Sequence, residues 1–171
     1  MATTEAVGAL EAAFRRIAAT RMAGLPLNNQ ALRVQAVGFR PQDDGYLVGV
    51  LVTPWAINLM MLAPTPSREL YLSPDRRRTW DFPSGSYEFM GGEEPECGAY
   101  QFCSLFSPAF EFSDHASAVD TAAAVMDALY VDSAPDLAAG QDEARLAGRS
   151  ILDVPTTRRG FLQGVLGPRR A

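Results

Sequence analysis

Apolar residues at intervals of three and four mark the start of the chain, which is the spacing of one buried face of a helix. Thr4 can cap this helix, and Pro26 ends it because proline has no N–H to continue the hydrogen-bond pattern. The predicted helix covers residues 4–23. The positions on its apolar face are Val7, Leu10, Phe14, Ile17 and either Arg21 or Met22.

The pattern then changes to the alternation of a strand with one buried face, over residues 32–36. Residues 41–45, PQDDG, supply turn chemistry and predict a hairpin into residues 46–53. This second segment is apolar almost throughout, so we expect a central strand covered on both faces. Pro54 interrupts it and predicts a bulge or sharp bend, after which residues 57–62 resume as a third strand.

Further strands are predicted over residues 79–82, 86–90 and 99–105. Asp114 can cap a second helix that runs from His115 to about Tyr130. Its apolar face contains Ala118, Val119, Ala122, Val125, Met126 and Leu129. The order helix, strands, helix favours an α+β fold, in which a mainly antiparallel β-sheet carries N-terminal and C-terminal helices packed on one face.

The composition changes after residue 131 to Ala, Gly, Asp, Pro and Arg without an apolar period. We predict a single α+β domain over residues 1–131 and a flexible or contact-ordered tail over residues 132–171. Residues 1–144 carry nine arginines and nineteen acids, whereas residues 145–171 carry six arginines and one acid. The acidic body repels phosphate, which argues against nucleic acid, and suits a cationic peptide.

The chain begins without a recognisable secretory signal, and its longest apolar run, Leu59–Ala63, is too short to insert into a membrane. Cys97 and Cys103 are too few for a disulfide framework, so we predict a cytoplasmic protein. With His115 as the one histidine, the chain lacks the ligand spacings of a metal site. It also lacks a phosphate-binding glycine loop. We therefore predict a binding protein without catalytic residues, metal or cofactor.

Three features indicate where such a protein would bind. Pro54 and Trp55 lie at one strand break, and Leu105 and Phe106 lie at another. Apolar groups at strand breaks can form a groove for a hydrophobic peptide, although the same residues can also be plain core. The third feature is the C-terminal segment of residues 156–171, TTRRGFLQGVLGPRRA.

At these positions the sequence resembles the HybE/HupJ-type family of NiFe-hydrogenase assembly chaperones. The resemblance covers residues 25–165. The motifs that carry it are VGF at 37–39, LVTPWAINL at 51–59, FPSGSYEF at 82–89, YQFCSLFSPAFEF at 100–112 and RRGFLQG at 158–164.

The resemblance implies a cytoplasmic chaperone for an exported, membrane-bound NiFe hydrogenase. Such proteins bind the small-subunit precursor, which carries a twin-arginine signal, and bring it to the large subunit as a second partner. Some relatives carry a rubredoxin domain with CxxC pairs. This chain has no CxxC pair, so a separate rubredoxin is the corresponding expected partner and iron binding is not carried over.

A receptor for a twin-arginine signal needs carboxylates beside an apolar groove. Glu93, Glu94 and Glu96 have the highest acidic density in the chain and are the predicted carboxylates. Two alternatives stay open: a thiol redox or oxygen-protection factor in hydrogenase maturation that uses Cys97 and Cys103, and a general peptide or small-ligand carrier.

Arg158, Arg159, Phe161 and Leu162 match the start of a twin-arginine motif, S/T-R-R-x-F-L, at the wrong end of the chain. Nine residues follow Leu162, and they include two glycines and a proline. An export signal needs a longer apolar segment followed by a cleavage site. Either the match is a coincidence in an arginine-rich sequence, or the segment imitates the client's signal and occupies its site in the empty chaperone.

Overall fold

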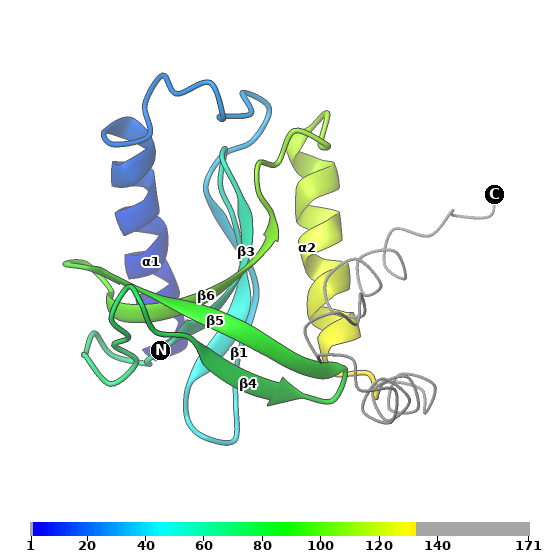
Figure 1. The fold of residues 1–171 in the computed structure, drawn as a ribbon. Coiled ribbons are helices and arrows are strands. Elements are labelled where there is room, and N and C mark those ends of the chain that lie inside the picture. The colour runs from blue at the N-terminus through cyan, green and yellow to red at the C-terminus, as the bar shows by residue number, and fades with distance from the viewer. Residues whose placement is uncertain (1, 133–171) are drawn as a thin grey trace.

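The computed structural model describes residues 2–132 of the 171-residue chain. Its elements are α1 (Ala2–Ala19), β1 (Gln35–Pro41), β2 (Leu47–Val52), β3 (Ile57–Leu62), β4 (Arg78–Phe82), β5 (Gly85–Glu94), β6 (Gly98–Phe106) and α2 (His115–Leu129). The six strands form one antiparallel sheet in the order β1-β2-β3-β6-β5-β4 (Figure 1). The predicted α+β fold, with an antiparallel sheet and N- and C-terminal helices, is confirmed.

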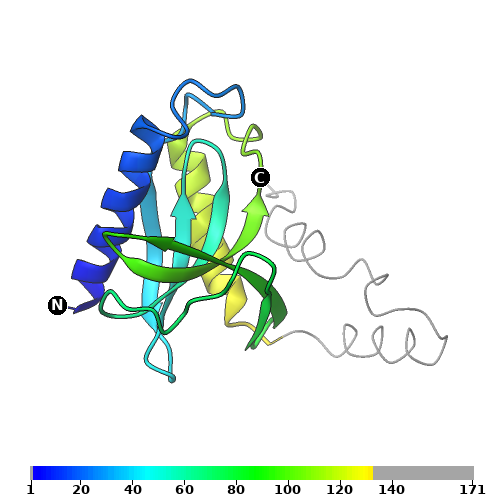
Figure 2. The ribbon, with the colours of Figure 1, turned by 60° about the vertical axis from the view of Figure 1, so that its left-hand side comes forward.

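The two helices cover opposite faces of the sheet, so the prediction that both lie on one face is wrong (Figures 1 and 2). Alternate side chains of β2 show this directly: Val48 and Val50 join the core under α2, while Leu47 and Leu51 join the core under α1. All six residues of β2 and all six of β3 are buried. Strands that are apolar on both faces need a cover on each, and one helix supplies each cover.

Element boundaries differ from prediction where tertiary contacts intervene. α1 ends at Ala19 rather than near residue 23, and the first strand begins at Gln35 rather than residue 32. Leu32 instead donates its N–H to the Asn29 carbonyl. The strand predicted over residues 86–90 is longer than expected, because β5 continues to Glu94 and includes two of the acidic residues.

Other boundaries follow the sequence closely. β3 covers the predicted residues 57–62, and α2 begins at His115. The Asp114 side chain accepts a hydrogen bond from the Ser117 N–H at 2.7 Å, which confirms the predicted cap. Gly38 takes a φ of +67° at a register shift in β1, a conformation that favours glycine.

The predicted tail, residues 132–171, lies outside the described residues apart from Asp132. Arg158, Arg159, Phe161 and Leu162 lie outside them as well. Within residues 2–132, no helix is long and apolar enough to cross a bilayer.

Candidate functional site

Three loops meet at the end of the sheet where β2 turns into β3 and where β6 ends (Figure 1). We call this end, formed by residues 20–34, 53–56 and 107–114, the loop end. Asn29 ties the loops together. Its side-chain amide donates to the carbonyl oxygens of Ala109 at 2.9 Å and Phe112 at 2.8 Å, and its backbone N–H donates to that of Pro54 at 2.7 Å.

The sharp bend predicted at Pro54 is a hairpin turn closed by Thr53. The Thr53 N–H and hydroxyl both donate to the Ala56 carbonyl, at 2.9 and 2.7 Å, and the hydroxyl oxygen accepts from the Ala56 N–H at 3.0 Å. Ile57, just past the turn, lies opposite Phe106 in the β3–β6 register. The register therefore brings together the two strand breaks that the sequence singled out.

The predicted binding residues in the loop end and in the adjoining end of β6 differ in their access to solvent. Pro54, Trp55 and Leu105 are half-buried, whereas Phe106 is only 5% exposed. The Trp55 ring stacks on Phe14 of α1 with the ring centroids 6.3 Å apart. Phe106 therefore supports the loop end from inside the core, and the other three retain partly accessible surface.

Sequence reasoning missed the most exposed apolar side chains of the loop end. Leu25, Leu27 and Phe110 are 38%, 37% and 57% exposed. Glu111 follows Phe110 and is also exposed. The available sequence signal was weak: leucines on both sides of Pro26, and a phenylalanine shortly after Pro108. These residues place apolar surface beside a carboxylate on loops that Asn29 braces.

A groove of about 740 Å³ runs between α1 and β1 and reaches the loop end at Pro54. Its lining residues are Glu11, Arg15, Ala18, Ala19, Leu32, Arg33, Val34, Gln35, Ala36 and Pro54. Within it, Glu11 Oε1 accepts the Ala36 N–H at 2.8 Å, and Glu11 Oε2 lies 3.0 Å from Arg15 Nη2. The groove therefore joins an edge strand, a charged pair and the loop end.

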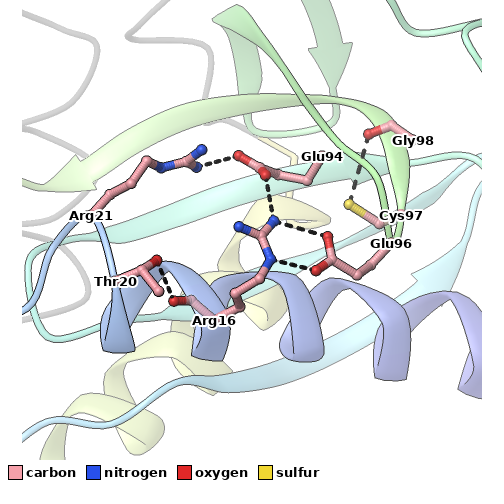
Figure 3. Close-up of polar contacts among 7 residues, drawn as sticks. All are labelled: Arg16, Thr20, Arg21, Glu94, Glu96, Cys97 and Gly98. Atoms are coloured by element: carbon pink, nitrogen blue, oxygen red, sulfur yellow. Dashed lines mark hydrogen bonds and ion pairs between the residues drawn. The ribbon is translucent and has the colours of Figure 1, made fainter.

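The predicted carboxylates lie at the end of β5 and just after it. Two of them form ion pairs with Arg16 of α1 and with Arg21, which follows α1 (Figure 3). Glu94 is 7% exposed and forms ion pairs with Arg16, at 2.7 Å, and with Arg21. Glu96 accepts from Arg16 Nε at 2.6 Å and Nη2 at 3.0 Å. We call residues 93–97 the acidic turn.

Glu93 lies apart from that network and pairs with Arg68 at 3.1 Å. The hydrogen bonds from Arg16 lower the pKa of Glu96 to about 2, and those to Glu96 and Glu94 raise the pKa of Arg16. The carboxylates of the acidic turn are thus paired with the chain's own arginines. The acidic turn clamps the C-terminal end of α1 against the β5–β6 hairpin.

The two cysteines lie on opposite faces of the sheet. Cys97 belongs to the core under α1 and Cys103 to the core under α2, and both side chains are buried and form no disulfide. Burial raises the pKa of Cys97 to about 11, so little reactive thiolate forms at neutral pH. This arrangement does not suit a dithiol redox pair. Among residues 2–132, no group of three His, Cys, Asp or Glu side chains is placed to hold a metal.

His115 has a structural position in the first turn of α2. Its Nδ1 accepts the Arg33 N–H at 3.3 Å, and its Nε2 lies 2.8 Å from Gln35 Oε1. Burial, reinforced by the charge of Arg33, lowers the pKa of His115. A neutral ring that accepts through Nδ1 and donates through Nε2 satisfies both contacts, and it holds α2 against the segment that lines the groove.

Comparison with known proteins bears on this arrangement. The family model described as NiFe-hydrogenase assembly chaperone HybE matches residues 5–164. Protein HoxT of Cupriavidus necator is 46% identical, over 68% of this chain and 71% of HoxT. Hydrogenase expression/formation protein HupJ of Bradyrhizobium diazoefficiens is 38% identical, over 94% of this chain and 89% of HupJ. The solution structure of HybE from Escherichia coli shares the fold, with a TM-score of 0.50 and 20% identity over 99% of this chain and 88% of that one.

Proposed function

Because the chain belongs to the HybE family of NiFe-hydrogenase assembly chaperones, we propose that it binds the precursor of a hydrogenase small subunit before that subunit leaves by the twin-arginine route. The family resemblance drawn from the sequence motifs is confirmed. The proposal places the protein in the cytoplasm, where precursors acquire their cofactors. It acts by holding its client, which lowers the free concentration of immature, export-competent subunit and requires no catalysis.

The observation that carries this proposal is the exposed apolar surface of the loop end. Leu25, Leu27 and Phe110 stand on loops that Asn29 fixes to each other. Exposed apolar groups on fixed loops can bind an apolar segment with little loss of conformational entropy. Pro54, Trp55 and Leu105 add half-buried apolar groups at the neighbouring strand breaks, and Phe106 is buried in the core behind them.

The cationic part of a twin-arginine signal needs carboxylates. The three predicted carboxylates could bind it only by exchanging their present partners for the arginines of the signal. Glu94 and Glu96 would have to release Arg16 and Arg21. Glu93 would have to release Arg68. Such an exchange also frees the C-terminal end of α1 from the acidic turn. Client binding at the acidic turn would therefore be coupled to movement of α1.

Two extensions of the proposal concern the other partners and the C-terminal segment. The large subunit is a second client and a separate rubredoxin a further partner, as the family resemblance implies. The segment with Arg158, Arg159, Phe161 and Leu162 imitates the client's signal and competes with it for the same site.

The direct test is capture of the small-subunit precursor by the purified full-length protein, with and without the signal peptide. We expect capture of the complete precursor and its loss when the signal is removed. A variant with Leu27→Ser and Phe110→Ser should capture less. Val131→Ser, which changes an apolar side chain that is 63% exposed but lies past the end of α2, is the matched control. Failure of the wild-type protein to capture the precursor would refute the proposed function.

A further inference from the structure

We propose that the groove beside β1 receives an extended, arginine-bearing segment of the client's signal as an added strand, with Glu11 as the carboxylate that binds its guanidinium group. This inference rests on the proposed function and locates its recognition step. It requires no exchange at the acidic turn.

The first support is the free edge of the sheet. β1 pairs with β2 and lies at the end of the strand order, so its other side has no strand partner among the described residues. The Ala36 N–H points to that side, because it donates to Glu11 Oε1 at 2.8 Å. The carboxylate oxygen thus takes the place that the carbonyl oxygen of an added strand would occupy.

The second support is the available space. The groove measures about 740 Å³, within the range of about 300–1,000 Å³ typical of ligand sites. Its α1 wall presents the small side chains of Ala18 and Ala19, and its β1 wall presents Ala36. Small residues on both walls let the backbone of a bound segment lie close to the strand edge.

The third support is the Glu11 carboxylate, which a bound strand would free from the Ala36 N–H. When a carbonyl oxygen takes the Ala36 N–H, Glu11 keeps only its contact with Arg15, whose side chain is 59% exposed. Exposed ion pairs between helix residues four apart are weak. Arg33 also lines the groove, but it is exposed to solvent, so its charge is screened. A guanidinium group delivered by the bound segment can therefore displace Arg15 and take over the Glu11 carboxylate in a two-point contact. Glu94, by contrast, is buried and holds two arginines already.

The fourth support is continuity with the loop end. Pro54 lines the groove and also belongs to the loop end, where Asn29 holds its carbonyl oxygen. Arginines placed beside Glu11 are followed in a twin-arginine signal by apolar residues. Those residues can continue past Pro54 toward Leu25 and Leu27. The order of charge and apolar surface on the protein thus matches the order of the two features in the ligand.

The test measures binding of a fluorescent synthetic signal peptide of the small-subunit precursor to the full-length chain. Two substitutions in the groove are paired with controls elsewhere on α1. Ala19→Trp fills the groove, and Ala12→Trp places the same bulk on another exposed alanine. Glu11→Gln retains an acceptor for the Ala36 N–H but removes the charge, and Glu5→Gln removes an exposed charge outside the groove.

We expect Ala19→Trp and Glu11→Gln each to weaken binding by about tenfold or more, the scale of one lost charge-assisted hydrogen bond. The two controls should stay within about twofold of wild type. A peptide with both arginines changed to glutamine should bind wild type and Glu11→Gln equally, because the charge of Glu11 then has no partner.

Equal binding by wild type, Ala19→Trp and Glu11→Gln would overturn the inference while leaving the proposed function intact, provided that the wild type still captures the whole precursor. Tighter binding by Ala19→Trp would also overturn it, because a peptide that binds more tightly once the groove is filled must bind elsewhere. Conversion of a dimer to a monomer by Ala19→Trp, measured by light scattering, would assign the groove to a second copy. If the wild type captures neither peptide nor precursor, both proposals fail together.

Discussion

The side-chain amide of Asn29 donates a hydrogen bond to the backbone carbonyl oxygen of Ala109, eighty residues further along the chain. This bond, with its companion to Phe112, fixes the loop after α1 to the loop before α2. Neither loop has a regular hydrogen-bond ladder of its own. Asn29 therefore links the two loops that carry the exposed side chains of Leu25, Leu27 and Phe110.

Replacing Asn29 by alanine should separate these loops. Two carbonyl oxygens lose their partner, so we expect the free energy of unfolding to fall by about 1–3 kcal/mol and capture of the precursor to weaken. Urea denaturation and pull-down measure the two effects. Asn28→Ala is the control, because Asn28 bonds within its own loop, to the Met22 carbonyl. It should lower stability without a comparable loss of capture; equal losses of capture would show that Asn29 has no special role.

The acidic turn predicts a dependence of stability on acid pH. The pKa of Glu96 lies near 2 in the folded protein because Arg16 donates hydrogen bonds to it, whereas the ordinary pKa of a glutamate side chain is 4.5. Its stabilising contribution is therefore complete above about pH 4.5 and is lost as pH falls toward 2. Urea midpoints of wild type should decline more steeply across this range than those of Glu96→Gln. Parallel curves for the two proteins would contradict the ion pair.

His115 predicts a second, separate pH effect. Burial lowers its pKa in the folded state, so the folded protein binds a proton less readily than the unfolded chain. Stability should be greatest above the unfolded pKa of about 6.5 and should fall as pH decreases below it. His115 is the only histidine in the chain, so His115→Gln should flatten the profile between pH 7 and 5. A wild-type profile that is already flat would disprove the assignment.

The cysteines should prove dispensable. Cys97 and Cys103 are buried on opposite faces of the sheet, so we expect slow reaction with a thiol reagent in the folded protein and fast reaction in urea. A variant with both changed to alanine should still support hydrogenase maturation and capture the precursor. Loss of maturation with retained folding and capture would instead favour the redox alternative.

Removal of the C-terminal segment tests the proposal that this segment imitates the client's signal peptide and competes with it for the binding site. Truncation after Pro155 should tighten binding of the signal peptide, because the competing arginines of the chain are gone. Arg158→Gln with Arg159→Gln in the full-length chain should have the same effect, which separates charge from length. Weaker binding after truncation would show that the segment belongs to the client contact.

The sequence by itself determined the elements with a strong local period and the family. β3 and α2 follow their apolar patterns almost residue for residue, because side-chain direction repeats every two residues in a strand and every 3.6 in a helix. The nearly continuous apolar residues of β2 likewise predicted a strand covered on both faces, and all six residues of β2 are buried. The motifs around Pro54 and Phe106 were enough to identify the family.

Tertiary structure alone decided which distant residues meet. The apolar period of a helix does not state which face of the sheet it covers, so α1 and α2 were both assigned to one face. Nor did the acidic segment reveal that Arg16, 78 residues from Glu94, would neutralise it. Only the register of β3 with β6 and the position of Asn29 assemble the loop end. Periodicity reflects local backbone geometry, whereas ion pairs, loop contacts and grooves depend on the strand order that brings separate segments together.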